Sequence, residues 1–353
     1  MQIQIFTRDN LSKKSPVLIA VPKPVALFIS ETMLDHFGLN LISDPLRFET
    51  QGLLSENFLV KTKAGQKVVK WRKGGTQTRE RLVKELELTE KVGNLGLQVS
   101  VPLKNSSNQY VHSDSNNCFA CFDFIEGDYF KGSEEEMISA ANGFSKFTKA
   151  LEKVNTERIY KNHYKGSISC LKKLLQGTEY PATGTQTDKR IYFENRKFLL
   201  GKTNKLEVKI DQLKTDIRLC HTDFHPLNLL FDPDGTLKSI LDFEDVKPYP
   251  LMASLGFACY KLTRQFMSEL SVSEQRSCSE LCLRIWETEW KKIHSFDGCF
   301  KEKLREGATL RVLELIQVIL EQWFKRGNLK LNFDLQKQIR SLYEIDFIYA
   351  KGN

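Results

Sequence analysis

The sequence predicts an α+β protein with two lobes: a small β-rich N-terminal lobe over residues 1–125 and a larger, mostly helical C-terminal lobe over residues 126–353. Three observations support this fold class. The chain of 353 residues is longer than one hydrophobic core usually serves. Short β-prone runs with turn signals between them are concentrated before residue 125. Segments with helical periodicity dominate after it.

The N-terminal lobe is predicted from one hairpin, one helix and one apolar strand. Residues 55–73 contain two β-prone runs joined by Lys63–Gly65, which is a hairpin signal. Residues 79–92 have helical periodicity. The run Cys118–Phe124 is apolar and strand-like, and it is broken by Glu126 and Gly127. We therefore expect the chain to pass from one lobe to the other at this break.

The C-terminal lobe is predicted from long amphipathic segments. Acidic residues at the start of the first of them suit the positive end of the helix dipole. We expect helices over residues 133–154, 254–270, 273–294, 308–327 and 334–350.

Composition and charge exclude several classes of protein. The net charge of +8 is spread along the chain without a dense Lys/Arg block, so nothing indicates nucleic-acid binding. No apolar stretch reaches the roughly 18 residues that a membrane span needs. The eight cysteines include Cys118 with Cys121 and Cys278 with Cys282, but these pairs lie in strand-like and helical segments, which argues against zinc. We expect a cytoplasmic protein with reduced thiols, either a monomer or a homodimer.

One short segment, HTDFHPLNLLFD at residues 221–232, combines polar and apolar residues in a distinctive order. A β-prone run follows Asn228, and a turn, a second β-prone run and Asp242 follow in sequence. Two short strands joined by a turn can bring Asp223, Asn228 and Asp242 to one edge. Carboxylate and amide oxygens are ligands that Mg²⁺ accepts beside phosphate oxygens. One carboxylate then remains to face a substrate hydroxyl.

Here the sequence resembles the aminoglycoside phosphotransferase and choline kinase-like family of small-molecule kinases. HTDFHPLNLLFD is similar to the catalytic loop of that family, and SILDFED is similar to its metal-binding segment. The resemblance implies a bilobal protein-kinase-like fold that binds ATP between its lobes. It also implies that Asp223 is the catalytic aspartate and that Asn228 and Asp242 hold Mg²⁺.

The resemblance extends into the N-terminal lobe. The hairpin at residues 55–73 is similar to the glycine-loop hairpin of the family, which implies that Lys70 binds phosphate. Backbone groups near Ser55 and Asn57 are then expected to lie against the nucleotide phosphates. The segment that contains Phe124 and Ile125 is similar to the one that passes the adenine.

Lys70 needs a carboxylate to hold it, and Glu85 is the best candidate. Glu85 shares one helical stripe with apolar residues, namely Leu82, Leu88 and Val92. We therefore expect Glu85 to point inward and pair with Lys70. Glu87 is the second choice, because its stripe has the character of a solvated face.

The sequence departs from the family pattern at several positions. A G-x-G-x-x-G loop is missing, and Thr222 stands where the family usually has glycine. Glu244 follows Asp-Phe where glycine is frequent, and Ser254 stands where an aspartate would help to brace the catalytic loop. His221 is expected to support the loop structurally.

The leading hypothesis is an ATP- and Mg²⁺-dependent kinase that phosphorylates a hydroxyl of a small molecule. Choline, ethanolamine, homoserine, a sugar and an aminoglycoside-type antibiotic are all open as acceptors. We expect His225, Glu244 and Asp245 to contact the acceptor. Alternatives are a protein Ser/Thr kinase, which the missing A-P-E segment disfavours, and a non-catalytic nucleotide-binding regulator, which the residue at Ser254 favours.

Overall fold

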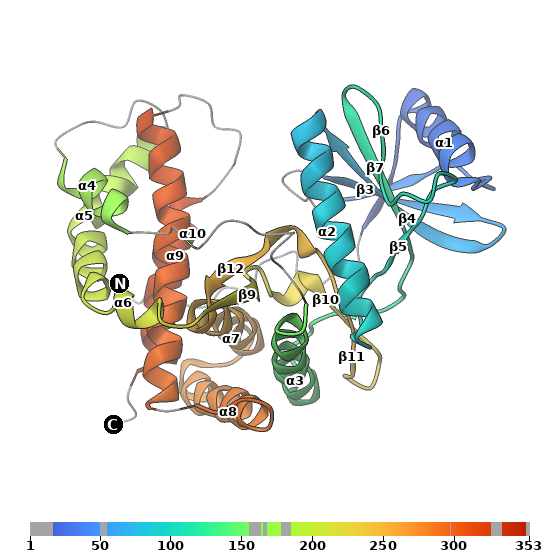
Figure 1. Ribbon diagram of the computed structural model, residues 1–353. Helices are drawn as coiled ribbons and strands as arrows, with labels where there is room; N and C mark the ends of the chain where they lie inside the picture. Colours follow the sequence, from blue (N-terminus) through green and yellow to red (C-terminus); the bar gives the residue numbers. More distant parts are fainter. Residues whose placement is uncertain are drawn as a thin grey trace.

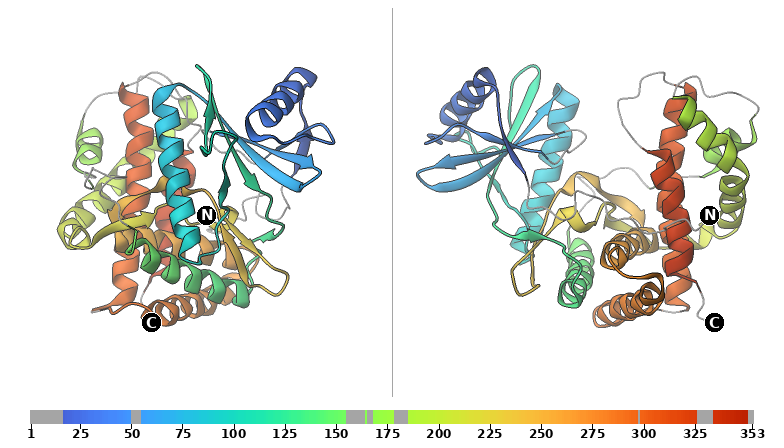
Figure 2. Two further views of the ribbon diagram at one scale, coloured as in Figure 1. Left: turned by 45° about the vertical axis from the view of Figure 1, so that its right-hand side comes forward. Right: turned by 180° about the vertical axis from the view of Figure 1, so that it is seen from behind.

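The computed structural model describes residues 17–49, 55–154, 164, 168–177, 185–296, 298–325 and 334–350. An antiparallel sheet with two helices forms the N-terminal part, and a mainly helical body forms the C-terminal part (Figure 1). The predicted α+β class is thereby confirmed. In the right-hand view of Figure 2 the sheet and helix α1 lie on the opposite side of the molecule from the long helix α9.

The N-terminal sheet has seven strands in the order β1-β2-β3-β4-β7-β5, with β6 paired to β7. The strands are β1 Leu18–Ala20, β2 Leu46–Phe48, β3 Glu56–Thr62, β4 Gly65–Lys73, β5 Pro102–Leu103, β6 His112–Ser113 and β7 Asn117–Asp123. The predicted hairpin is β3–β4, joined by a tight turn after Thr62.

Two helices cover the two faces of this sheet. Helix α1 (Lys23–Phe37) packs Ile29 and Met33 against Val69 of β4. Helix α2 (Thr76–Asn94) packs Leu82 and Leu86 on the other face. Since side chains alternate along a strand, β4 directs Val68, Lys70 and Arg72 towards the α2 side of the sheet.

The C-terminal body consists of helices around two small sheets. Its helices are α3 Glu134–Leu151, α4 Ser169–Gln176, α5 Gln186–Glu207, α6 Ile210–Leu213, α7 Leu251–Met267, α8 Val272–Lys291, α9 Phe300–Lys325 and α10 Leu335–Ile348. Its strands are β8 Asp128–Tyr129, β9 Ile217–His221, β10 Leu229–Phe231, β11 Leu237–Ile240 and β12 Val246–Pro250, with 3-10 turns η2 Pro226–Asn228 and η3 Phe243–Asp245. The sheets have the strand orders β11-β10-β8 and β12-β9.

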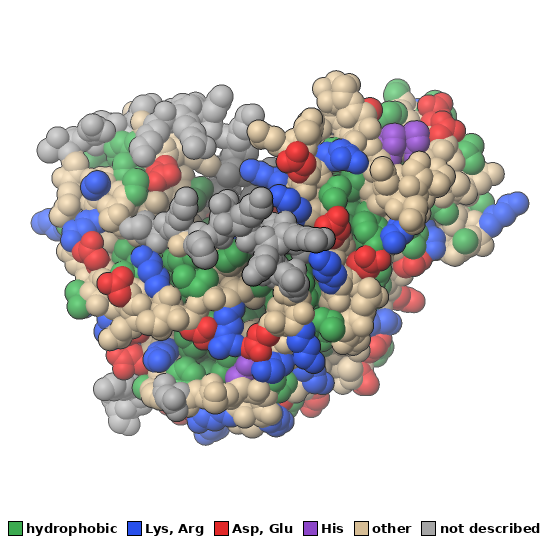
Figure 3. All heavy atoms as spheres, viewed as in Figure 1, with side chains coloured by type: hydrophobic (Ala, Val, Ile, Leu, Met, Phe, Trp, Pro, Cys, Tyr) green, Lys and Arg blue, Asp and Glu red, His purple; other side chains and the backbone are tan. Residues whose placement is uncertain are grey.

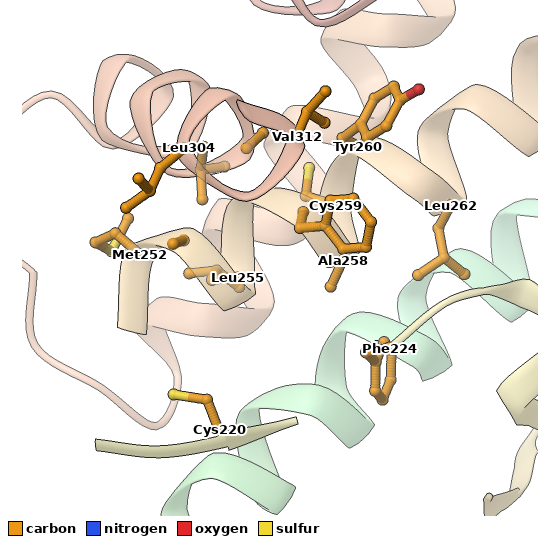
Figure 4. Packing of buried hydrophobic residues seen from close by; sticks show 14 of the residues in the cluster. Cys220, Phe224, Met252, Leu255, Ala258, Cys259, Tyr260, Leu262, Leu304 and Val312 are labelled. Atoms are coloured by element: carbon orange, nitrogen blue, oxygen red, sulfur yellow. The ribbon is translucent and has the colours of Figure 1, made fainter. Parts of the chain in front are cut away.

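Helix α7 lies at the centre of this body and crosses α9 at very short range. Figure 4 shows Met252 of α7 close to Leu304 of α9. A Cβ on Gly307 would lie 1.9 Å from the Met252 carbonyl oxygen, so only glycine permits this approach. The expected start of this helix at residue 308 was therefore wrong: Gly307 lies inside α9, at the crossing, and does not end it.

The two parts are joined by the segment after β7, where residues 124–127 have no regular structure before β8 begins. The division expected between residues 125 and 126 falls in this segment and stays a prediction. Helix α2 contacts α3 and η3, so the N-terminal part also touches the C-terminal part directly.

The surface mixes both signs of charge. On the face shown in Figure 3, Lys and Arg side chains are interspersed with Asp and Glu side chains. Within the described residues, none of the helices has the length and apolar character needed to cross a membrane.

Candidate active site

The catalytic-loop motif begins where β9 ends. Strand β9 pairs with β12, which places His221 opposite Val246. Two polar contacts then fix the loop: Ser254 Oγ donates to the His221 carbonyl oxygen at 2.8 Å, and Thr222 Oγ1 donates to the Asp245 carbonyl oxygen at 2.8 Å. Ser254 stands where we expected an aspartate to help brace the loop, and it braces the loop as a hydrogen-bond donor.

His221 has a structural environment. Its Nε2 lies 3.1 Å from the Leu241 carbonyl oxygen, which can only accept, so Nε2 carries the proton. Its Nδ1 accepts the backbone N–H of Asp223 at 3.3 Å. Burial lowers the pKa of His221 below its ordinary value. The neutral ring therefore joins the end of β9 to Asp223 in the loop and to Leu241 after β11.

Asp223 extends from the loop beside His225. The His225 Nε2 lies 3.3 Å from Asp223 Oδ2, and the His225 Nδ1 accepts the backbone N–H of Leu227 at 3.2 Å. This second contact leaves the proton on Nε2, where it can be donated to the carboxylate. Burial opposes ionisation, but His225 and the Arg311 guanidinium hold the pKa of Asp223 well below its ordinary value. The carboxylate is thus ionised at neutral pH.

A backbone hydrogen bond joins Asn228 to Leu241, the residue before Asp242. The Leu241 backbone N–H donates to the Asn228 carbonyl oxygen at 2.8 Å. The Asn228 Nδ2 donates to the Asp223 carbonyl oxygen at 2.9 Å, which orients the amide and leaves its oxygen as an acceptor. Asp242 has φ 58° and ψ 81°, a left-handed conformation that side-chain-bearing residues adopt mainly where the fold requires it.

These oxygens fit a divalent cation of the Mg²⁺ type. One carboxylate and one amide oxygen supply hard donors and leave positions for phosphate oxygens and water. Burial raises the pKa of Asp242, but the charges of Lys70 and Arg72 outweigh it and hold that pKa below its ordinary value. The Asp242 carboxylate is therefore ionised.

Lys70 reaches this segment from the N-terminal sheet. Its Nζ lies 2.7 Å from Glu85 Oε1 on α2 and 3.2 Å from Asp242 Oδ1. The structure thus brings together the pair expected from the helical stripe. Burial alone lowers the pKa of Lys70, yet the carboxylates of Asp242 and Glu85 raise it overall. An ammonium held by two carboxylates is a fixed positive charge for phosphate oxygens.

Arg72 is a charged residue of the site that our sequence analysis missed. Its Nε donates to Ser55 Oγ at 2.6 Å and its Nη2 donates to Glu244 Oε2 at 2.6 Å. The same Nη2 lies 2.8 Å from Glu85 Oε2, an ion-pair contact without hydrogen-bond alignment. A period of two along β4 from Lys70 is the signal that could have found it.

In the segment expected to lie beside the adenine, some backbone groups bond to β4 and others point away from it. The Phe124 N–H donates to the Gln66 carbonyl oxygen at 3.1 Å, so it belongs to the β4–β7 ladder. Because groups alternate in an antiparallel pair, the backbone polar groups of Asp123 point away from β4.

The remaining predicted contacts are distributed around the site. Asn57 is half-buried and lies opposite Lys70 in the β3–β4 register. Asp245 pairs with Arg311 and Lys247 at 2.8 and 2.9 Å. Contact of Asn57 with phosphate, and of His225, Glu244 and Asp245 with an acceptor, stays a prediction. The glycine-poor loop at residues 50–54 lies outside the described residues.

Lys70 and Arg72 come from the N-terminal sheet, and Asp223, Asn228 and Asp242 come from the C-terminal part. This arrangement defines a kinase-like phosphotransferase. Residues 47–276 match the phosphotransferase enzyme family (APH). This match spans more than half of the chain, so the protein belongs to that family and is a small-molecule kinase. A comparison with curated proteins gives no match.

Solved structures show the same fold. Spectinomycin phosphotransferase APH(9)-Ia bound to AMP has a TM-score of 0.65 and 12% identity, covering 93% of this chain and 99% of that chain. Amicoumacin kinase hAmiN, in complex with AMP-PNP and Ca²⁺, has a TM-score of 0.61 and 11% identity, with 93% of each chain covered. A microcompartment-associated aminopropanol kinase has a TM-score of 0.58 and 11% identity, covering 92% of this chain and 95% of that chain.

Proposed function

We propose that this enzyme transfers the γ-phosphoryl group of ATP, with Mg²⁺, to a hydroxyl of a small molecule. The observation that carries the proposal is the contact of Lys70 with Asp242 across the lobes, at 3.2 Å. It supports a site in which a phosphate-binding cation and a metal-binding carboxylate act on one nucleotide.

Each residue then has one task. Lys70 holds the non-transferred phosphates, and Glu85 fixes the position of Lys70. The segment with Phe124 and Ile125 lies beside the adenine, and the backbone polar groups of Asp123, which point away from β4, are available to it. Mg²⁺, held by Asn228 and Asp242, would neutralise charge on the phosphate oxygens.

Asp223 acts on the acceptor. Its carboxylate orients the hydroxyl and takes its proton as the new bond to the γ-phosphorus forms and ADP leaves. The His225 Nε2 lies 3.3 Å from the same carboxylate and so restricts its rotamers. The low pKa of Asp223 makes it ready to accept the hydrogen bond of the hydroxyl at neutral pH. Positioning and charge account for most of the rate in such a reaction.

Two alternatives are less well supported. In a protein kinase an activation loop would separate the metal segment from the following helix, but here only β12 lies between η3 and α7. A non-catalytic regulator has no chemical need for Lys70, Asp223, Asn228 and Asp242 together. The bracing contact of Ser254 also removes the reason for expecting a weakened loop.

The acceptor class and the cellular location have indirect support. The relatives named above act on spectinomycin, amicoumacin and aminopropanol, which supports an amino-alcohol or antibiotic acceptor. Cys118 and Cys121 belong to different core clusters of the sheet, which supports reduced thiols and a cytoplasmic enzyme. We propose a monomer or a homodimer.

An ADP-release screen tests the function. Purified protein is incubated with ATP and a panel of aminoglycosides, amino alcohols, homoserine and sugars, with Mg²⁺ or with EDTA. Acceptor-dependent ADP release in Mg²⁺ alone is the expected result. Magnesium-independent transfer, or phosphorylation of a protein substrate in place of every small molecule, would contradict the proposal.

A further inference from the structure

Two ion pairs connect β4 of the N-terminal part with η3 of the C-terminal part, and their residues have the same spacing on both sides. Lys70 and Arg72 are two residues apart on one face of β4, and Asp242 and Glu244 are two residues apart at η3. Lys70 pairs with Asp242 and Arg72 pairs with Glu244. The first pair contains the groups that bind phosphate and metal in the proposed function.

The two pairs differ in what else their members contact. Lys70 and Asp242 lie 3.2 Å apart, and the side chain of Asp242 is 39% exposed, so this pair can exchange with a nucleotide and its metal. Arg72 and Glu244 lie 2.6 Å apart, and their side chains are 3% and 29% exposed, less than those of Lys70 and Asp242 at 10% and 39%. Arg72 also contacts Ser55 through its Nε and Glu85 through its Nη2, so two of its three guanidinium nitrogens are held by protein groups.

Arg72 therefore joins three parts of the site at once. It contacts the start of β3 through Ser55, helix α2 through Glu85 and the metal segment through Glu244. A planar guanidinium can serve several acceptors in fixed directions, which a lysine at this position could not do. Glu244 in turn accepts the hydrogen bond of Arg72 Nη2 at 2.6 Å, so each member of the pair has the other as a partner.

We infer that the Arg72–Glu244 pair is a positioning element that holds the Asp242 segment in register with Lys70 and Glu85. This inference rests on the proposed function, because it assigns the pair to the alignment of the nucleotide-metal site. In the proposed function Arg72 and Glu244 are assigned no contact with phosphate or metal. Its loss should weaken the contribution of the metal to nucleotide binding and leave metal-free binding nearly unchanged.

The test compares ATP affinity in Mg²⁺ with ATP affinity in EDTA, by calorimetry, for the wild type and Glu244→Gln. The variant keeps the size of the side chain and removes its charge. We expect the gain in ATP affinity that Mg²⁺ gives over EDTA to fall by about tenfold in Glu244→Gln. This factor lies near the lower end of the effects seen when one hydrogen bond to a charged group is lost. Affinity in EDTA should stay within about threefold of wild type.

Asp232→Asn is the matched control. It makes the same carboxylate-to-amide change in an ion pair with Lys238 at 2.8 Å, in the β10–β11 hairpin. It should leave both affinities unchanged. Arg72→Lys is a second variant that keeps the charge, and it should reproduce the effect of Glu244→Gln because one ammonium cannot serve all three partners.

Hydrogen exchange of the free protein separates positioning from general stability. Glu244→Gln should speed exchange of the amides at residues 241–245 and leave those of α9 unchanged. Faster exchange with an unaltered Mg²⁺ gain would overturn the inference, since the pair would then be structural only. A wild type that binds ATP equally with and without metal would contradict the proposed function, and the inference would fail with it.

Discussion

Replacing Lys70 with Met tests the ion pair on which the phosphate site depends. Removing one partner of a buried ion pair costs about 3–5 kcal/mol when the remaining charge has no other partner. Here Glu85 keeps a second contact, because its Oε2 lies 2.8 Å from Arg72. We therefore expect Lys70→Met to lower the free energy of unfolding by about 1–3 kcal/mol, the range for a weakened polar contact. ATP binding should weaken in the same variant.

A double-mutant cycle with Glu85→Gln measures the pairing itself. Glu85→Gln removes the charge that Lys70→Met leaves behind, so the double variant should be more stable than the sum of the single effects by roughly 1 kcal/mol. Urea unfolding of the four proteins gives the free energies. Lys67→Met is the control, because Lys67 is directed to the opposite face of β4 and pairs with Asp123. Additive effects of Lys70→Met and Glu85→Gln would refute the pairing.

Three further predictions follow from the site. Asp242→Asn should remove most of the gain in ATP affinity that Mg²⁺ gives over EDTA, and an unchanged gain in calorimetry would contradict its role as ligand. Burial raises the pKa of Asp245, but Arg311 and Lys247 hold that pKa below 3.8 overall. The ionised Asp245 therefore stabilises the fold above pH 3.8, and this stabilisation is lost in acid. In unfolding titrations Asp245→Asn should be less stable than wild type at pH 7, and the difference should shrink towards pH 3. Ser254→Asp should cost at least about 2 kcal/mol, because a buried carboxylate cannot donate to the His221 carbonyl; a thermal unfolding midpoint equal to wild type would exclude that bracing contact.

The sequence predicts those parts of the site that depend on short spacing. Asp223, Asn228 and Asp242 lie in one loop-hairpin segment, so their proximity follows from the turn between β10 and β11. The pairing of Glu85 with Lys70 follows from one helical stripe, because only one acid on α2 shares the buried face. The overall fold follows because β-prone and helical segments are separated along the chain.

The contacts between distant segments could not be predicted in this way. Strand periodicity places Arg72 on the same face as Lys70, but its partner Glu244 is 172 residues away. Asp245 meets Arg311 of α9, and no local pattern assigns that helix position to the catalytic loop. The start of α9 was missed because a glycine such as Gly307 locally resembles a helix break. The need for glycine at this position comes from the crossing with α7, which the sequence does not reveal.

The central claim is that Asp223 is the catalytic aspartate of a kinase, and Asp223→Asn tests it most directly. The change keeps the shape of the side chain, and the proposed metal ligands Asn228 and Asp242 remain. With an acceptor from the screen, kcat should fall by about 10²–10⁴, the usual effect of losing a general base. The Kd for ATP with Mg²⁺, measured on the same preparation, should stay close to wild type. Retention of most of the transfer rate by this variant would contradict the assignment.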